Sequence, residues 1–349
     1  PFRDRRSQYW PRTGETMTNV GVPLIDLSPS YNGTFEGKKM VAEQINSACM
    51  DLGFFAITGH GVEMSLINEF RKISHEFFEQ PLENKMKFIH PVDGTPRGYR
   101  VFAGEALGRA SIAGEPPDLK EFYHIGPNEW PDDEYHTGRE GQKYFIPNIW
   151  PDHPTGFKSI ALNYYREMEI LEKHLMQISA IALGINQNHF DDKMDKHVSA
   201  MRINYYPPQR QSPMEGQLRA GPHTDYGGMT ILMGEDEVGG LQVRTRQGNW
   251  IEVQTRPEFF VINIGDLLMQ WTNDKWISNL HRVSNPPSEV ATSARRISIV
   301  FFHQPNYDAL VQCIPTCTDS KNPPRYKPVL SGNYRDQKYT DTSLSNSEK

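Results

Sequence analysis

Apolar residues recur at helical spacing in the first half of the chain and at strand-like spacing in the second half. Over Lys38–Leu52 and Glu63–Phe78 they fall three or four residues apart, which is typical of an amphipathic helix. The longest such run is Thr155–Gly184. We therefore predict three long helices, the first ended by Gly53 and the second by Pro81. A further short helix is predicted around Leu82–Lys87.

After residue 196 the pattern changes to short apolar runs separated by turn residues. Nine short candidate strands in roughly 115 residues are typical of a β-sandwich or jelly roll. Residues 90–155 are rich in Gly, Pro, His and Asp and are predicted to be loops that wrap the body. The predicted strands of the second half are Ser199–Tyr206, Gly228–Met233, Gly240–Arg244, Asn249–Val253, Phe259–Ile264, Leu267–Trp271, Leu280–Ser284, Arg296–His303 and Ala309–Ile314.

Composition and charge exclude several classes of protein. The chain has 349 residues and a net charge of −6, without a basic stretch that would bind nucleic acid. The chain has no run of 18 apolar residues that could cross a membrane, and residues 1–6 lack the apolar stretch of a secretory signal. The three cysteines form no C-x-x-C pair, which argues against a disulfide framework. We therefore expect a cytoplasmic protein with a small-molecule partner, and the oligomeric state stays open.

The segment His223-Thr-Asp225 is the first candidate for chemistry. In a β-strand, residues i and i+2 point to the same face, so the imidazole and the carboxylate are aimed at one point. His281, at the start of a later predicted strand, can provide a third ligand. Two histidines and one carboxylate form the facial triad of non-haem Fe(II) oxygenases, although the same donors also suit Zn(II).

Arg296-Ile-Ser298 is the second candidate. Its two polar side chains again share a face of one strand, and the apolar residues that follow predict that this strand is buried. A buried guanidinium needs a carboxylate partner, and a small dicarboxylate cosubstrate can provide it.

Together these motifs resemble the iron(II)/2-oxoglutarate-dependent dioxygenases of the isopenicillin N synthase-like family. The resemblance extends over about residues 20–335. It rests on the ordered set His223-Thr-Asp225, His281, Arg296-Ile-Ser298, Asn204-Tyr-Tyr-Pro207, Gly239-Gly-Leu-Gln-Val243, Asn263-Ile-Gly-Asp266 and Val22-Pro-Leu-Ile-Asp26. The segment Asn285–Ala294, between His281 and Arg296, looks longer than is usual in the family.

The resemblance implies an α+β fold with a mainly β core, a double-stranded β-helix (jelly roll) flanked by helices. It divides the chain into a leader or disordered extension (1–19), an N-terminal region (20–155), a long supporting helix (156–196), the catalytic β-helix (197–315) and a C-terminal segment with a frayed tail (316–349).

The resemblance also implies roles for residues. His223, Asp225 and His281 would hold Fe(II). Arg296 and Ser298 would bind the distal carboxylate of 2-oxoglutarate, with Tyr206 and Asn204 completing that site. With O2, such an enzyme oxidises, most commonly hydroxylates, a C–H bond and releases succinate and CO2.

The substrate is expected to be a small molecule, in keeping with a role in secondary metabolism. Phe302, on the same strand as Arg296, would contact it according to the resemblance. Further apolar or aromatic candidates for the pocket are Tyr99, Phe102, Phe122, Met229, Ile231 and Leu241. Segments 117–123 and 293–306 resemble fungal thymine hydroxylase-like members, which makes a nucleobase hydroxylase one possible function.

Three further functions are compatible with these residues. An oxidase of the isopenicillin N synthase type would use the Arg296–Ser298 pair to bind a carboxylate of its substrate, without 2-oxoglutarate. A binding protein would keep the fold without turnover. A zinc hydrolase would need a general base beside the metal.

Overall fold

The fold is described from a computed structural model of the chain, which describes residues 20–92, 94–110, 114–235 and 239–342. The predicted leader, residues 1–19, therefore lies outside the described residues. The helices are α1 (Phe35–Asp51), α2 (Met64–Phe78), α3 (Leu82–Met86), α4 (Glu134–Thr137), α5 (Phe157–Ala182), α6 (Asp266–Trp271) and α7 (Ser331–Thr342). Short 3-10 helices cover Ser28–Tyr31, Leu107–Ala110, Gly141–Lys143, Asp191–Lys193 and Pro315–Cys317.

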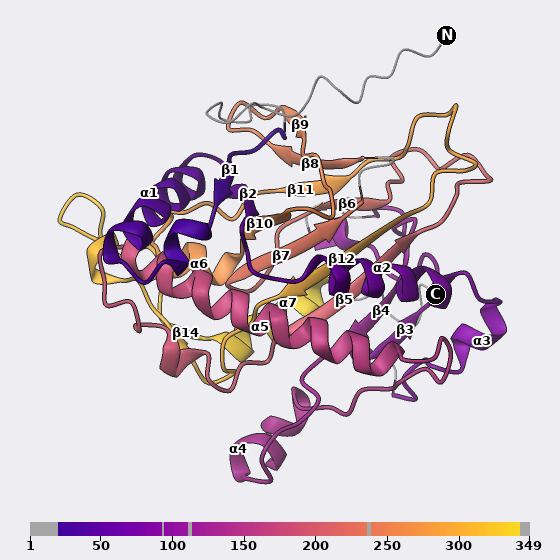
Figure 1. The fold of residues 1–349 in the computed structure, drawn as a ribbon, viewed down its shortest axis with the longest axis horizontal. Helices are drawn as coiled ribbons and strands as arrows, with labels where there is room; N and C mark the ends of the chain where they lie inside the picture. Colours follow the sequence, from indigo (N-terminus) through magenta and orange to yellow (C-terminus); the bar gives the residue numbers. More distant parts are fainter. Residues whose placement is uncertain (1–19, 93, 111–113, 236–238, 343–349) are drawn as a thin grey trace.

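Two β-sheets form the centre of the molecule (Figure 1). Over the described residues, the larger sheet has the order β1-β2-β10-β7-β12-β5-β4-β3 and the smaller one β6-β11-β8-β9, while β13 and β14 pair separately. The strands are β1 (Leu24–Asp26), β2 (Phe54–Thr58), β3 (Gly98–Arg100), β4 (Glu121–Ile125), β5 (Ala200–Tyr206), β6 (Ala220–His223), β7 (Met229–Gly234), β8 (Leu241–Arg244), β9 (Trp250–Glu252), β10 (Phe260–Ile264), β11 (His281–Val283), β12 (Arg296–Phe302), β13 (Leu310–Val311) and β14 (Val329–Leu330).

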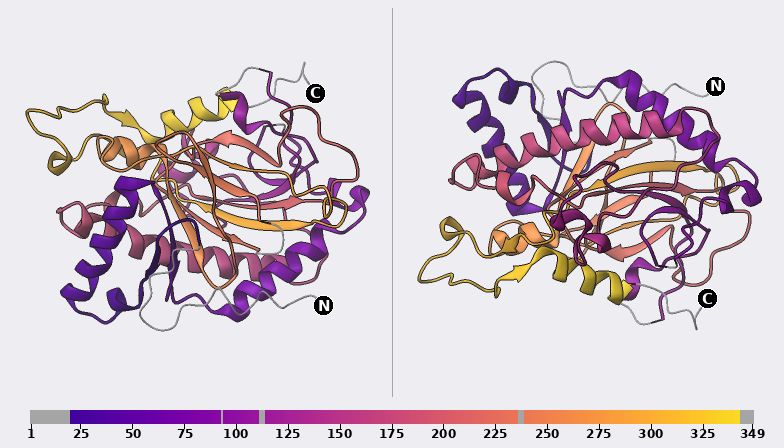
Figure 2. Two further views of the ribbon diagram at one scale, coloured as in Figure 1. Left: turned by 90° about the horizontal axis from the view of Figure 1, so that it is seen from above. Right: turned by 90° about the horizontal axis from the view of Figure 1, so that it is seen from below.

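The α5 helix lies on one side of the strands and α7 on the opposite side (Figure 2). On α5 the apolar residues recur every three or four positions, and the buried ones, from Phe157 to Ile178, join the main core. The sheet contributes alternate residues to this core. Residues 201, 203 and 205 of β5, 229, 231 and 233 of β7, and 297, 299 and 301 of β12 all belong to it. The intervening residues therefore point to the opposite face, toward the smaller sheet.

Most predicted elements of the β core are present. The β5 and β12 strands agree with the predicted ones to within a residue at each end. The predicted helices correspond to α1, α2, α3 and α5. Gly53 adopts φ of 74° directly after α1, and its N–H donates to the carbonyl of Ala48 at 3.0 Å. Because this conformation disfavours a Cβ atom, glycine ends the helix there as predicted.

Three predictions of local structure are wrong. The segment Leu267–Trp271 belongs to helix α6 and is not a strand. The prediction failed because a mostly apolar run of five residues has no periodicity that separates a strand from a helix. Within the predicted loop region 90–155, β3 and β4 extend the larger sheet. Residues 331–342, which include part of the predicted frayed tail, form α7. That helix is tied to the body where Tyr334 and Lys338 contact Asp266 at 2.8 and 2.9 Å.

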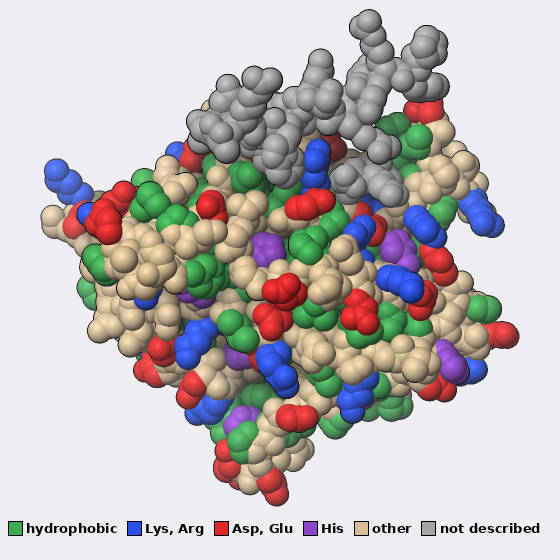
Figure 3. Space-filling model, in the orientation of Figure 1, with side chains coloured by type: hydrophobic (Ala, Val, Ile, Leu, Met, Phe, Trp, Pro, Cys, Tyr) green, Lys and Arg blue, Asp and Glu red, His purple; other side chains and the backbone are tan. Residues whose placement is uncertain are grey.

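Charged side chains of both signs are interspersed on the face shown in Figure 3, in keeping with the mild net charge. Among the described helices, none is both long and apolar enough to cross a membrane. The predicted cytoplasmic location and the division of the chain into parts stay predictions.

The packing of β12 against the helices makes a stability prediction. Ile299 is fully buried in the main core, so Ile299→Ala should lower the free energy of unfolding by about 2–5 kcal/mol in urea titration. The control is Ile170→Ala on α5, where the side chain is 59% exposed, and a change below about 0.5 kcal/mol is expected. Equal losses for the two variants would contradict the described packing.

Candidate active site

His223, Asp225 and His281 meet where β6 and β11 pair in the smaller sheet. The antiparallel register places His281 directly opposite His223, with ring centroids 4.2 Å apart. Asp225 follows two residues after His223, and its Oδ1 lies 3.8 Å from Nε2 of His281. Each residue offers one ligand atom, and the three atoms lie within 4.8 Å of one another. The donor set and its spacing fit one metal ion with one face left open.

Hydrogen bonds orient each of the three side chains. Nδ1 of His223 lies 2.7 Å from the carbonyl oxygen of Gly221, and Nδ1 of His281 lies 3.2 Å from that of Asn279. Each Nδ1 therefore carries the proton and donates to its carbonyl, which leaves the Nε2 lone pair for a metal.

The Asp225 carboxylate is oriented by two donors. Its Oδ2 accepts hydrogen bonds from Thr230 Oγ1 at 2.6 Å and Asn263 Nδ2 at 2.7 Å. Oδ1 is therefore the oxygen directed at the two imidazoles. The Asp266 carboxylate does not take part, since its Oδ1 accepts from Ser278 at 2.7 Å and its Oδ2 from Tyr334 at 2.8 Å.

The protonation states that this environment favours are those that bind a metal. Burial, followed by the neighbouring His281, lowers the pKa of His223 to about 3, so its imidazole is neutral. Burial alone would raise the pKa of the Asp225 carboxyl. The adjacent imidazoles of His281 and His223, with the two hydrogen-bond donors, outweigh burial and hold that pKa below its ordinary value. A neutral imidazole and an ionised carboxylate are the ligand forms.

The four residues predicted to bind the cosubstrate lie together on the inner face of the larger sheet. Arg296 pairs with Tyr206 across β12 and β5, and Ser298 pairs with Asn204. The Arg296 guanidinium is 1% exposed and lies 5.1 Å from the centre of the Tyr206 ring. Within the described residues, none of its three nitrogens has a hydrogen-bond partner, and neither has the buried Oδ1 of Asn204. Because a buried, unpaired cation is costly, this geometry fits an anionic ligand.

Arg219 is a second buried cation at this position. It is fully buried, and its guanidinium lies 5.8 Å from the same Tyr206 ring. Nη2 donates to the carbonyl of Ala294, whereas Nε and Nη1 find no partner in the described part of the chain. Burial, then the charge of Arg296, lowers the pKa of Arg219 to about 10. Two neighbouring guanidinium groups strengthen the case for an anion between them.

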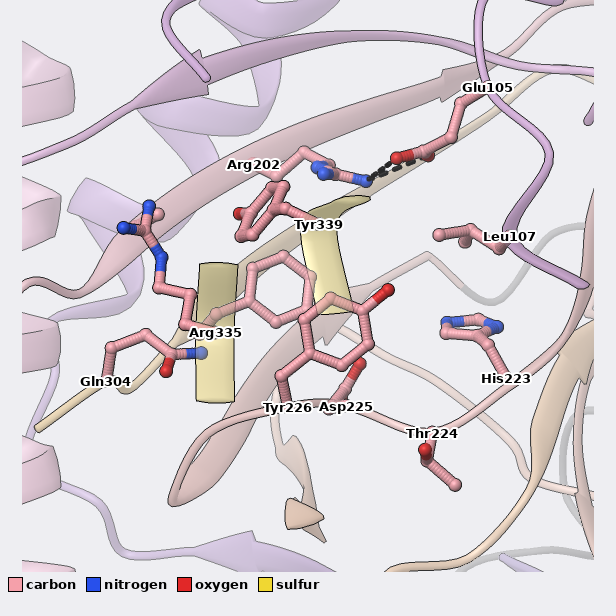
Figure 4. A pocket seen from close by; sticks show the side chains of 12 residues that line it. Glu105, Leu107, Arg202, His223, Thr224, Asp225, Tyr226, Gln304, Arg335 and Tyr339 are labelled. Atoms are coloured by element: carbon pink, nitrogen blue, oxygen red, sulfur yellow. Dashed lines mark hydrogen bonds and ion pairs between the residues drawn. The ribbon is translucent and has the colours of Figure 1, made fainter. Parts of the chain in front are cut away.

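A pocket opens beside His223 and Asp225, and Figure 4 shows the side chains around it. Phe302 lines it, as the sequence predicted, together with Ala200 from the neighbouring strand. Polar and aromatic residues from β5, α7 and three loops complete the wall. They are Glu105, Arg202, Thr224, Tyr226, Gln304, Arg335 and Tyr339, with Leu107 beside them.

The structure does not bring the other predicted substrate residues into this pocket. Met229 and Ile231 point from β7 into the main core, because odd-numbered residues of that strand face the helices. Tyr99 is fully buried in the same core, where its hydroxyl donates to Glu121. These three predictions are therefore corrected. Phe122 stands behind the pocket and packs under Arg202, whose guanidinium lies 4.4 Å from the ring centre.

Two weaker candidates also lie away from the pocket. Leu241 belongs to a separate apolar cluster with Phe54 and Val243. Phe102 is 46% exposed and is not part of the pocket wall.

Sequence reasoning missed several residues, and only some of them carried a signal. Arg219 lies four residues before His223, and the same alternation that joined His223 to Asp225 would have placed it on that face. Thr230 alternates with Met229 and Ile231 in the same way. Glu105, Arg335 and Tyr339 come from distant loops and a helix, so no local pattern linked them to the site.

Two family models match separate parts of the chain. Residues 197–305 match the family model described as the 2OG-Fe(II) oxygenase superfamily. Residues 22–153 match the model described as the N-terminal part of non-haem dioxygenase in morphine synthesis.

Three relatives illustrate the similarity. The chain is 33% identical over 318 residues to the 2-oxoglutarate-Fe(II) type oxidoreductase hxnY of Emericella nidulans, covering 90% of this chain and 88% of the relative. Jasmonate-induced oxygenase 2 of Arabidopsis thaliana is 30% identical, with 93% and 80% covered. A full-length Neurospora crassa protein, solved in complex with alpha-KG and thymine, has a TM-score of 0.80 and 29% identity, with 93% and 99% covered.

The chain belongs to the 2OG-Fe(II) oxygenase superfamily. It is accordingly a 2-oxoglutarate-Fe(II) dioxygenase with the jelly-roll fold of that superfamily, and its cofactors are Fe(II), 2-oxoglutarate and O2. The predictions of family, fold, enzyme class and cofactors are thereby confirmed.

The triad makes a prediction about metal binding. Asp225→Ala removes one of three ligands and should weaken Fe(II) binding by at least about 100-fold. Mutation of a residue that only hydrogen-bonds to a ligand already lowers metal affinity by about 10–100-fold. Iron per chain after anaerobic gel filtration provides the measurement. Asp152→Ala, at an exposed position, is the control and should retain iron. Full iron content in Asp225→Ala would rule out this ligand.

Proposed function

We propose that His223, Asp225 and His281 hold the iron, that Arg296 and Arg219 bind the distal carboxylate of 2-oxoglutarate, and that the enzyme hydroxylates a C–H bond of a small molecule in the adjoining pocket. The single observation that carries this assignment is the buried Arg296 guanidinium without a partner among the described residues. It lies on the same sheet face as Tyr206, which packs with Ala220 and Val283 of the two strands that carry the histidines. A dicarboxylate can neutralise this charge at one end and reach a metal with the other.

Iron and 2-oxoglutarate, when bound, supply the oxidising chemistry with O2, and succinate and CO2 are the coproducts. The residues of the chain bind the cosubstrate and orient the metal ligands. Ser298 and Asn204 face the same site as Arg296 and add a hydroxyl and an amide for the cosubstrate. Thr230 and Asn263 hold the Asp225 carboxylate in one orientation, and the carbonyls of Gly221 and Asn279 keep both Nδ1 protons in place.

The pocket holds the substrate beside the triad. Phe302, Tyr226 and Tyr339 provide aromatic surface, and such walls bind flat or apolar molecules while limiting access of water. The substrate carbon must lie close to the open face of the triad, so the shape of this wall decides which bond is oxidised.

A hydroxylase of a ring heterocycle is a second, narrower candidate. It is favoured by the TM-score of 0.80 with the Neurospora crassa protein solved with thymine, and by the aromatic wall of the pocket. A role in secondary metabolism also stays part of the proposal.

Coupled product formation tests the function. Purified protein with Fe(II), 2-oxoglutarate and O2 should release one succinate for each molecule of a small-molecule substrate consumed, measured by mass spectrometry over a substrate panel. Omission of 2-oxoglutarate should abolish substrate loss. Substrate oxidation without 2-oxoglutarate would indicate an oxidase of the isopenicillin N synthase type and contradict the proposal.

Binding of 2-oxoglutarate tests the two arginines. Arg296→Met and Arg219→Met should each weaken 2-oxoglutarate binding at least about tenfold, because each removes a charged hydrogen-bond donor. Calorimetry with the Zn(II)-loaded protein measures this without turnover. Binding of 2-oxopentanoate, which lacks the distal carboxylate, should change little.

Arg295→Met is the matched control, because Arg295 is half-exposed and pairs with Glu79 outside the site. Equal weakening of both oxo acids in Arg296→Met or Arg219→Met would show a general structural effect. That result would remove the arginine concerned from the cosubstrate site.

A further inference from the structure

The pocket contains an ion pair that is already complete. Nη1 of Arg202 on β5 donates to both carboxylate oxygens of Glu105, at 3.1 and 2.9 Å, and both residues line the pocket (Figure 4). Behind them, Lys120 donates to Glu105 at 3.0 Å and to Asp118 at 2.9 Å. Lys120 is 2% exposed, so it supports Glu105 from the interior and does not face the ligand.

The orientation of Arg202 is fixed from several directions. Its Nε lies 3.3 Å from Nε2 of His124, and its guanidinium lies over the rings of Phe122 and Phe302, 4.4 and 5.6 Å from their centres. Across the described residues, no hydrogen bond engages Nη2. The side chain therefore presents Nη2 as a donor in a constant position, next to the acceptor oxygens of Glu105.

The charge of Arg202 is matched within the protein. Arg202 and Lys120 lower the pKa of Glu105 to about 2, although burial alone would raise it, so the carboxylate is ionised. The Arg202 guanidinium faces the Glu105 carboxylate at the pocket wall, and the ammonium of Lys120 has Asp118 as a second partner. Arg335, the other arginine of the wall, lies over the rings of Tyr144 and Tyr339, 5.1 and 4.9 Å from their centres. The pairing of Arg202 differs from the state of Arg296 and Arg219, whose guanidinium groups have no carboxylate partner in the described structure.

The pair of Arg202 as a donor and Glu105 as an acceptor is complementary to one kind of ligand group. The edge of an amide offers a carbonyl oxygen next to an N–H, so it can accept from Arg202 and donate to Glu105 at the same time. Tyr226 and Tyr339 add aromatic surface to the same pocket, with their ring centres 5.9 Å apart. Aromatic walls of this kind favour a flat ligand.

We infer that the substrate is a flat, uncharged molecule with an amide edge, such as a lactam, an imide or a ring carboxamide, and that Glu105 discriminates against free carboxylic acids. This inference rests on the proposed function for the location of the substrate. A ligand carboxylate bound to Arg202 would lie next to the Glu105 carboxylate. Two negative charges in contact with the same guanidinium in a partly buried site repel each other strongly.

Matched pairs of probes test the inference. The pairs are nicotinamide with nicotinate and indole-3-acetamide with indole-3-acetate, which differ in charge and hardly in shape. Their dissociation constants are measured by calorimetry on the full chain loaded with Zn(II) and 2-oxoglutarate, which cannot turn over. In the wild type, each amide should bind at least about tenfold more tightly than its acid. A tenfold ratio needs only a small part of the repulsion energy between two close like charges.

Glu105 is tested by substitution. Glu105→Gln removes the negative charge and leaves Arg202 unpaired, so the preference for the amide should fall by at least about tenfold or reverse. Glu105→Asp keeps the charge and should keep the preference, which separates charge from folding. Glu79→Gln is the matched control, because it removes the same charge at a surface position 42% exposed, and it should leave the ratio unchanged.

Three results would overturn the inference. The first is a wild type that binds the acids as tightly as the amides. The second is a Glu105→Gln variant that folds and keeps the wild-type ratio, and the third is failure of both amides to bind. The proposed function is judged separately by succinate release with Fe(II). Succinate release with a preference for acids would therefore defeat only the inference, and an amide preference without any succinate would defeat only the proposed function.

Discussion

The antiparallel pairing of β6 with β11 is the constraint on which the site depends. It places His281 directly opposite His223, and the chain then needs only two more residues to bring Asp225 to the same point. Backbone carbonyls two residues before each histidine accept its Nδ1 proton, so the ring orientation follows from the strand itself. A shift of the register by one residue would turn one imidazole to the other face and separate the three ligands.

The same alternation divides the larger sheet into two faces with different tasks. On β12, Ile297, Ile299 and Phe301 pack against the helices, whereas Arg296 and Ser298 face the site. The apolar face stabilises the strand and thereby holds a guanidinium where water cannot reach it. An anionic ligand would offset the cost of that buried charge. Arg202 in the substrate pocket is already paired with Glu105, so its charge needs no anionic ligand.

The sequence could predict those features that follow from short-range periodicity. His223 with Asp225, and Arg296 with Ser298, were found because residues two apart on a strand share a face, and His281 because a strand begins there. The family resemblance then placed Tyr206 and Asn204 beside them. The same rule, applied to β7, would have shown that Met229 and Ile231 face away from Thr230 and therefore away from the site.

Other features depend on contacts that no local pattern records. Glu105 contacts Arg202 across 97 positions of the chain, and Tyr339 lies at the pocket on α7, a helix that Tyr334 ties to Asp266. The helical conformation of residues 266–271 likewise depends on the tertiary position of the segment, where the N–H of Asp266 donates to the carbonyl of Asp225 at 2.8 Å. A five-residue apolar run by itself is compatible with either conformation.

A crystal structure of the protein grown anaerobically with Fe(II) and 2-oxoglutarate tests the central claim most directly. We predict one metal bound by Nε2 of His223, Nε2 of His281 and the Oδ1 oxygen of Asp225, with the distal carboxylate of 2-oxoglutarate between Arg296 and Arg219. A metal bound by other residues, or an Arg296 guanidinium that pairs with a carboxylate of the protein while 2-oxoglutarate lies elsewhere, would contradict it.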